Sequence, residues 1–209
     1  MFNRIFYKAR PRKLFLYYKI HEFLKDKNFL NIIDLGCGDG SLRKIVNFKQ
    51  YDGVDIDSQS IEKTKKKETK NENFFLGDIK NFLFKKQYDL TLCIQLIGFN
   101  KNFNISDLDE IILQMDKCTR VNGYLIFNIG SKIIDKIETI EKKISTNFEI
   151  INKITYGNFK KKRNFLVAKF ILFLQIYLNN LKKGPSTNIL YICKKKNENI
   201  KTSFMHYCY

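Results

Sequence analysis

The chain has 209 residues, of which 44% are hydrophobic and 28% are charged, and only two are proline. This composition excludes a fibrous or disordered protein, and the length suits one domain with a substantial core. The formal net charge of +17 allows a nucleic acid or an anionic membrane as a partner. The lysine runs are scattered, however, and solvated helix faces or strand ends explain each of them.

The cysteines and histidines give no sign of a metal site or a disulfide framework. Five cysteines include no Cys-x-x-Cys pair and no zinc-like spacing to His21 or His206. They are interpreted as small apolar residues in a reducing compartment. The N-terminal residues lack the apolar stretch of a secretory signal. We therefore expect a cytoplasmic protein without a metal, in at most peripheral contact with a membrane.

Predicted helices and strands alternate along the chain. Apolar residues at helical spacing follow Pro11 and predict a first helix that reaches Leu24. A buried strand at Asn31–Leu35 ends in glycines, and the apolar residues within Leu42–Val46 predict a helix after them. Further strands are expected at Tyr51–Asp55, Asn73–Leu76, Tyr88–Ile94, Gly123–Ile129, Phe148–Tyr156 and Asn188–Lys194. Further helices are expected at Ser58–Lys67, from the Ser106-x-x-Asp109 capping box onward, along Ile133–Ile144 and at Arg163–Leu181.

This alternation predicts an α/β fold, with a mostly parallel sheet and helices on both of its faces. Residues 1–28 are expected to form an N-terminal helical segment that packs on the core. Residues 29–196 are expected to form the main domain, with a helical insertion at about 160–183. Residues 197–209 are a C-terminal tail.

The most informative segment is the glycine-rich turn after the first predicted strand. It reads Asp-Leu-Gly-Cys-Gly-Asp-Gly over residues 34–40. Glycines let a backbone pass close to a ligand, and this turn lies at the sheet edge where ligands bind in doubly wound folds. The G-x-G-x-G spacing differs from the G-x-G-x-x-G of dinucleotide pyrophosphate sites. The flanking Asp34 and Asp39 favour a cationic or amine-bearing ligand.

Three further segments follow at the ends of successive strands. Asp55 in Gly53-Val54-Asp55 ends the second strand, where a carboxylate can accept hydrogen bonds from both ribose hydroxyls. Asp78 in Gly77-Asp78-Ile79 follows the third strand, where it can accept from an adenine amino group. Tyr88–Cys93 forms a fourth strand that ends beside the expected reaction centre.

In this order and spacing, the four segments resemble the motifs of the class I S-adenosylmethionine-dependent methyltransferases. The resemblance covers about residues 29 to 130. It implies a Rossmann-like, seven-stranded sheet with strand order 3-2-1-4-5-7-6 and strand seven antiparallel. It also implies S-adenosylmethionine as the cofactor and methyl transfer as the reaction.

The resemblance further implies a role for individual residues. Gly36, Cys37 and Gly38 would lie against the methionine part of the cofactor, with Asp34 at its amino group. Asp55 would bind the ribose. The residues implied to contact the adenine are Ile56, Asp78 and Ile79. The residues implied near the transferred methyl group and its acceptor are Cys93, Gln95 and Phe99.

Each acidic residue also has a purely structural interpretation. Asp34 can cap the turn that follows it, and Asp55 and Asp57 can be ordinary turn acids. Asp78 can cap a short helix that starts near Asn81.

The segment after the fourth strand departs from the pattern of the family. Many members that act on small molecules carry an acidic residue and then a histidine there, whereas this chain has Gly98 and Phe99. The usual candidate base is therefore missing. Methyl transfer does not strictly require one, because a sulfonium is already a strong electrophile. We assign no catalytic residue from the sequence.

The sequence leaves the methyl acceptor open. The family resemblance implies a small-molecule, sugar or lipid acceptor. Residues 164–178 are apolar almost all round and carry basic flanks, which favours a lipid-linked or otherwise apolar acceptor among these. This helix either covers the mouth of the active site or contacts an anionic membrane. A nucleic-acid acceptor is disfavoured, since no Asn/Asp-Pro-Pro-aromatic motif follows the fourth strand. A subunit that binds the cofactor without turnover also remains an alternative.

Overall fold

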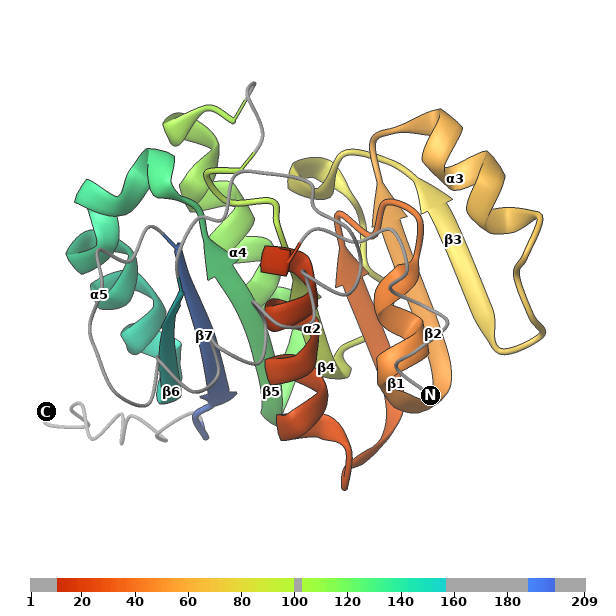
Figure 1. Ribbon diagram of the computed structural model, residues 1–209, viewed down its shortest axis with the longest axis horizontal. Coiled ribbons are helices and arrows are strands. Elements are labelled where there is room, and N and C mark those ends of the chain that lie inside the picture. Colours follow the sequence, from red (N-terminus) through yellow and green to blue (C-terminus); the bar gives the residue numbers. More distant parts are fainter. Residues whose placement is uncertain (1–10, 100–102, 157–187, 198–209) are drawn as a thin grey trace, which may run out of the picture.

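The computed structural model describes residues 11–99, 103–156 and 188–197 (Figure 1). Seven strands form one sheet in the order β3-β2-β1-β4-β5-β7-β6, which confirms the predicted order. Strands β1 to β5 pair in parallel, and β7 runs antiparallel to both β5 and β6. The strands are β1 (Asn28–Leu35), β2 (Asn47–Asp55), β3 (Glu72–Leu76), β4 (Tyr88–Cys93), β5 (Thr119–Ile129), β6 (Phe148–Tyr156) and β7 (Asn188–Lys195).

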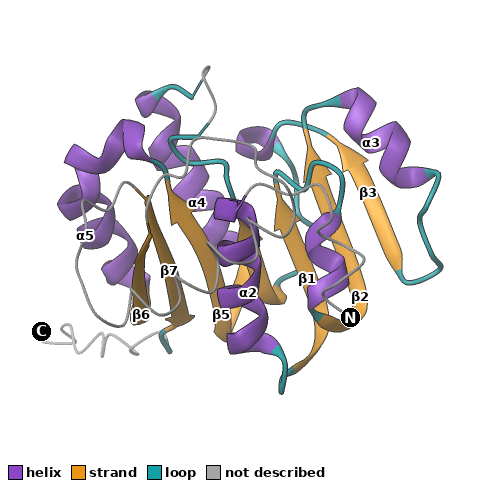
Figure 2. Ribbon diagram, viewed as in Figure 1, coloured by secondary structure: helices purple, strands orange, loops and turns teal. Residues whose placement is uncertain are grey.

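Helices cover both faces of the sheet (Figure 2). The four described α-helices are α2 (Pro11–Leu24), α3 (Ser58–Lys65), α4 (Leu108–Cys118) and α5 (Ile137–Asn147). Side chains alternate between the faces of a strand, so neighbouring residues enter different cores. Ile32 packs in the cluster that contains α2, whereas Ile33 packs in the cluster that contains α4 and α5. Both residues are buried, which explains the continuous apolar run in β1.

The segment predicted as a helix after the glycine turn is a 3₁₀ turn, not an α-helix. Only a 3₁₀ segment, η1 (Ser41–Ile45), follows the turn, and Val46 is already extended with φ −126° and ψ 149°. The next strand begins at Asn47, so the chain has room for little more than one turn. Helical spacing over so short a stretch does not distinguish an α-helix from a single 3₁₀ turn.

The capping box at Ser106 is also wrong. The side chain of Asn104 accepts a hydrogen bond from the Ser106 backbone N–H at 3.2 Å and caps the 3₁₀ segment η3 (Ile105–Asp107). Helix α4 begins after it, at Leu108. An asparagine reaches the N–H two residues ahead as readily as a serine, and the tertiary path of the chain selects between them. The predicted Arg163–Leu181 helix, the insertion at about 160–183 and residues 198–209 lie outside the described residues.

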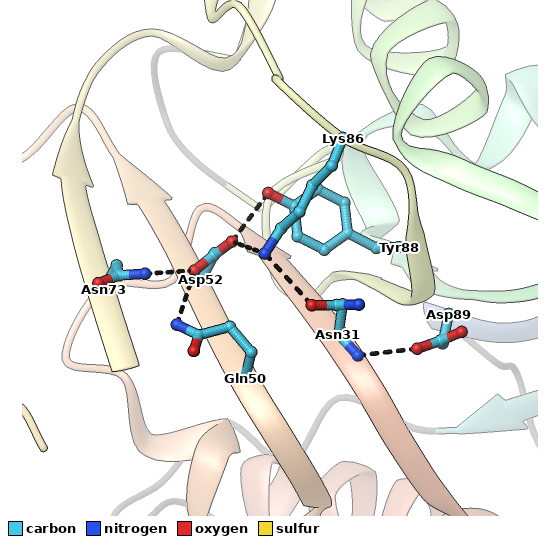
Figure 3. A network of polar contacts seen from close by, with 7 residues as sticks. All are labelled: Asn31, Gln50, Asp52, Asn73, Lys86, Tyr88 and Asp89. Atoms are coloured by element: carbon cyan, nitrogen blue, oxygen red, sulfur yellow. Dashed lines mark hydrogen bonds and ion pairs between the residues drawn. The ribbon is translucent and has the colours of Figure 1, made fainter. Parts of the chain in front are cut away.

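A buried carboxylate, Asp52 of β2, is compensated by partners from β3 and β4 (Figure 3). It accepts hydrogen bonds from Asn73 Nδ2 at 2.9 Å, from Gln50 Nε2 at 3.3 Å and from the Tyr88 hydroxyl at 3.0 Å. The Lys86 ammonium lies 3.0 Å from Asp52 Oδ2. A buried charge is tolerated when it is paired and hydrogen-bonded. The network therefore links β2 to its neighbour β3 and, across β1, to β4.

The turn after β4 is held by a second buried network. Gln95 adopts the left-handed conformation with φ 62°, which is unfavourable for a residue other than glycine. Its backbone N–H donates to Asn128 Oδ1 at 2.6 Å, and Asn128 Nδ2 donates to the Tyr156 hydroxyl at 2.6 Å. Asn128 is fully buried. Residues from β5 and β6 thus fix the direction in which the chain leaves β4.

We predict that Asn128→Ala lowers the free energy of unfolding by about 1–3 kcal/mol, because it removes the acceptor of the Gln95 N–H and the donor to the Tyr156 hydroxyl oxygen. Urea unfolding of purified protein measures this loss. Asn152→Ala is the matched control, because Asn152 is an exposed strand residue and its loss is expected to cost less than about 0.5 kcal/mol. Equal stability of the two variants would contradict the role given to Asn128.

Candidate functional site

A cleft of about 450 Å³ opens where the parallel strands end. Its walls come from the turns after β1, β2, β3 and β4 and from the start of α4. Ligands bind at this edge in open α/β sheets. Six of the residues predicted from the sequence line it, namely Gly36, Asp55, Ile56, Asp78, Ile79 and Gln95.

The glycine turn folds back on β2 and leaves its own backbone open to the cleft. The N–H groups of Gly36 and Cys37 donate to the Val54 carbonyl at 2.8 and 3.0 Å. Gly36 has φ 77°, and a β-carbon there would lie 3.4 Å from Leu96 Cδ1. A side chain would therefore be strained and would narrow the cleft where the turn meets the loop after β4.

Asp55 joins the glycine turn to the turn after β2. Its Oδ2 accepts from the Gly38 N–H at 2.6 Å, and its Oδ1 accepts from the Asp57 N–H at 2.9 Å. Asp57 itself caps α3 through Gln59 N, so its interpretation as a turn acid is confirmed. Asp55 is a turn acid too, but it also lines the cleft. Next to it, 71% of Ile56 is exposed, which places a large apolar surface at the cleft wall.

Asp78 caps the 3₁₀ segment η2 (Ile79–Asn81), which confirms its interpretation as a capping residue. Its Oδ1 accepts from the Lys80 N–H at 3.0 Å. The Lys80 ammonium lies 3.7 Å from Asp78 Oδ2 and 3.2 Å from Asp107 Oδ1. The hydrogen bond to Asp107 raises the pKa of Lys80, so the side chain stays charged. Asp78 also lines the cleft, so capping does not remove it from the site.

Asp34 lies beneath the glycine turn and is 1% exposed. Its Oδ2 accepts from the Tyr51 hydroxyl at 2.6 Å, while its Oδ1 is buried without a hydrogen-bond partner among the described residues. Burial raises the pKa of Asp34 to about 7, and the nearby Asp55 and Asp39 add to the rise. The Tyr51 hydrogen bond and the charge of Lys13 oppose it. This carboxyl group is therefore poised to titrate near neutral pH.

Cys93 and Phe99 are not placed on the cleft wall. Cys93 is fully buried in the core on the side of α4, because its side chain points away from the face that α2 covers. Burial raises the pKa of its thiol. Phe99 packs near Gly130, where an added β-carbon would lie 3.1 Å from the Phe99 ring. Cys37 is also buried and lies against Gly53 rather than in the cleft.

Sequence reasoning missed half of the cleft wall. The missed residues are Gly77, Lys80, Leu96, Phe103, Asp107 and Ile111. Gly77 and Lys80 flank the Asp78-Ile79 pair that the sequence already assigned to the site, so their place beside this pair could have predicted them. Phe103 and Asp107 belong to the connection between β4 and α4, and Ile111 lies in the first turn of α4. No local sequence pattern predicts that these residues line the cleft.

Within residues 11–99, 103–156 and 188–197, no helix is long and apolar enough to cross a membrane. No group of three or more His, Cys, Asp or Glu residues in those ranges could hold a metal ion.

Comparison with solved structures shows which fold this is. The N-methyltransferase NodS from Bradyrhizobium japonicum WM9 superposes with a TM-score of 0.66 at 12% identity, covering 91% of this chain and 99% of that one. Its complex with S-adenosyl-L-homocysteine gives 0.67 at 12% identity and covers 90% of each chain. An S-adenosylmethionine-dependent methyltransferase from Clostridium acetobutylicum ATCC 824 gives 0.59 at 16% identity, covering 91% of this chain and 92% of that one.

No curated protein sequence matches the chain significantly. A family model described as a methyltransferase domain matches residues 26–197, which is most of the sequence. This match confirms the resemblance to the class I S-adenosylmethionine-dependent methyltransferases. The chain belongs to the methyltransferase domain family.

Proposed function

We propose that this methyltransferase binds S-adenosylmethionine in the cleft at the ends of β1 to β4 and methylates a small-molecule, sugar or lipid-linked acceptor. The observation that carries the cofactor assignment is the pairing of Asp55 with the exposed Ile56 on one wall. A carboxylate beside an apolar surface suits a ribose joined to an adenine. Asp55 would accept from the ribose hydroxyls, and Ile56 would pack on the base.

The remaining residues fit the other parts of the cofactor. Asp34 keeps one buried oxygen without a partner in the described part of the chain, and an ammonium group would supply the missing donor. Gly36 and Gly38 leave the backbone free to lie against the methionine part. Asp78 and the Ile79 N–H would hold the adenine edge. Cys93 is left out of this assignment, because it faces the core.

The protein contributes position rather than proton transfer in this proposal. S-adenosylmethionine supplies a methyl group on a positively charged sulfur, which is already a strong electrophile. The cleft residues would hold the acceptor atom in line with that methyl, about 3–3.5 Å away, and exclude water. Gln95 extends from the strained turn after β4 into this region. Its amide can orient an acceptor without ionising.

The charge of the cleft supports an acceptor other than a nucleic acid. Three carboxylates, Asp55, Asp78 and Asp107, line the wall together with one cation, Lys80. A phosphate backbone would be repelled by this balance, whereas a cationic sulfonium is attracted. The apolar 164–178 segment keeps a lipid-linked acceptor in the proposal, although it lies outside the described residues.

We predict that Asp55→Ala weakens binding of S-adenosylhomocysteine by about 1–3 kcal/mol, which is the cost of removing a buried hydrogen-bond partner. Isothermal titration calorimetry on purified protein measures the change. Asp57→Ala is the matched control, because Asp57 is a turn acid two residues away that caps α3 outside the cleft. Circular dichroism verifies that both variants are folded. Absence of binding by the folded wild-type protein, or equal binding by both variants, would overturn the proposal.

We predict that affinity for S-adenosylhomocysteine rises with pH from about 5 to 7 and then levels off. The free Asp34 carboxyl has a pKa of about 7, raised by burial. A bound ammonium favours the carboxylate and lowers this pKa, so binding below pH 7 releases a proton. Calorimetry at pH 6 in buffers of different ionisation enthalpy counts the released protons. Asp34→Asn is expected to abolish the release; an unchanged proton count in this variant would exclude Asp34 as its source.

A further inference from the structure

The edge of the sheet that β3 forms carries exposed apolar side chains. Strand β3 is outermost in the sheet on that side and pairs only with β2 among the described strands. Its residues Phe75 and Leu76 are both exposed. Leu83, in the connection from η2 to β4, is 88% exposed, the largest fraction for a large apolar residue in the described ranges. One exposed leucine is common in proteins, whereas several that lie together indicate an interaction surface.

Ring contacts join these side chains into one surface. The Phe82 ring centre lies 5.7 Å from that of Phe75 in β3 and 4.9 Å from that of Phe84. Phe82 and Phe84 pack against the core on the side of α4, and Leu83 between them is turned to solvent. This alternation is that of extended chain, in which neighbouring side chains point to opposite sides. The fold therefore needs the two phenylalanines, but it sets no packing requirement for an apolar side chain at Leu83.

The apolar surface reaches the wall of the cleft. Gly77 lines the cleft, and a β-carbon added to it would lie 2.7 Å from Phe82 Cδ2. In the pairing of β2 with β3, Leu76 stands opposite Asp55, which also lines the cleft. A partner bound along the β3 edge would therefore lie beside the cleft.

Lysines without acidic partners border the same edge. Residues 65–70, from the end of α3 to the connection before β3, hold four lysines and one acid, Glu68. Lys85 follows Phe84 in the connection to β4. All five lysines are exposed, and none forms an ion pair with another described residue. Helix α3 packs beside β3, and the connections before β3 and β4 reach the same end of the parallel strands.

Apolar side chains bordered by lysines fit the surface of an anionic bilayer. Interfacial segments insert apolar side chains at the level of the headgroups, and nearby lysines are attracted to anionic lipids. A second copy of this chain is disfavoured, because two basic edges would repel each other. A nucleic acid would use the lysines, but it would leave Leu76 and Leu83 without a role.

From this arrangement we infer that the β3 edge docks the protein on an anionic membrane, with Leu83 inserted among the headgroups. Docking brings the cleft beside the bilayer, so the inference selects a lipid-linked acceptor from those proposed above. It rests on the proposed function for the acceptor alone, because docking itself needs no methyl transfer.

Flotation of the full chain with two kinds of vesicle tests the docking. One kind mixes phosphatidylcholine with phosphatidylserine, and the other contains phosphatidylcholine alone. We expect the wild-type protein to float with the anionic vesicles and not with the neutral ones. Leu83→Asn is expected to lower the partition coefficient roughly tenfold or more, because a leucine side chain no longer leaves water. Lys85→Gln is expected to lower it roughly fivefold, the effect of one lysine at an anionic surface.

Two control variants carry matched changes far from β3. Ile151→Asn removes an exposed apolar side chain of equal size from β6, the strand at the opposite edge of the sheet. Lys142→Gln removes an exposed lysine from α5, which lies at the other end of the molecule (Figure 1). Both are expected to float as the wild type does. Circular dichroism verifies folding, and calorimetry with S-adenosylhomocysteine is expected to give wild-type affinity for all four variants.

Failure of the docking and failure of the proposed function are distinguishable. If the folded wild-type protein floats with neither kind of vesicle, or equally with both, the docking is overturned. Equal flotation of Leu83→Asn and Ile151→Asn would place the membrane contact elsewhere, for instance at residues 164–178, and would also overturn it. So would a loss in Lys85→Gln without one in Leu83→Asn, because charge alone would then carry the binding. If flotation depends on Leu83 but the protein does not bind S-adenosylhomocysteine, the docking stands and the proposed function is wrong.

Discussion

The carboxylate of Asp55 is the contact on which the geometry of the site depends. Through one oxygen it holds the Gly38 N–H of the glycine turn, and through the other it holds the Asp57 N–H at the start of α3. The ends of β1 and β2 are thereby fixed relative to each other. Because the carboxylate has further lone pairs, it can bind these two turns and still present an acceptor to the cleft. The same interaction that closes the fold at this edge thus prepares the proposed ribose site.

Electrostatics then distinguishes two of the acids that follow the parallel strands, Asp34 after β1 and Asp78 after β3. Asp34 is buried with one oxygen unpartnered in the described chain, which makes its ionised form costly until a cation arrives. Asp78 lines the cleft, where Lys80 and its own capping contact already stabilise it. A buried carboxylate that lacks hydrogen-bond partners lowers the stability of the folded protein. Its position under a glycine turn is better explained by a ligand that completes it.

Much of the fold could be predicted from the sequence, and much of the site could not. Most strands are rich in apolar residues, and several end at or just before a glycine or an aspartate, so all seven could be predicted; their order came from the family resemblance. The segment after the glycine turn forms a 3₁₀ turn in place of the predicted helix, because apolar spacing over so few residues fits either. The family resemblance implied Cys93 near the transferred methyl group, whereas its side chain is buried in the core, because neighbouring residues of a strand point to opposite faces. The contact between Lys80 and Asp107 joins segments far apart in the sequence, and no local pattern records it.

The central claim is that the cofactor lies across the ends of β1 to β4, with its ribose on Asp55. A crystal structure of the protein with S-adenosylhomocysteine tests this most directly. The account predicts that the Asp55 carboxylate contacts the ribose hydroxyls and that Ile56 packs on the adenine. It also predicts that the amino-acid end lies over Gly36, Gly38 and the buried Asp34. Density for the ligand at another place, or an adenine that does not contact Ile56, would contradict it.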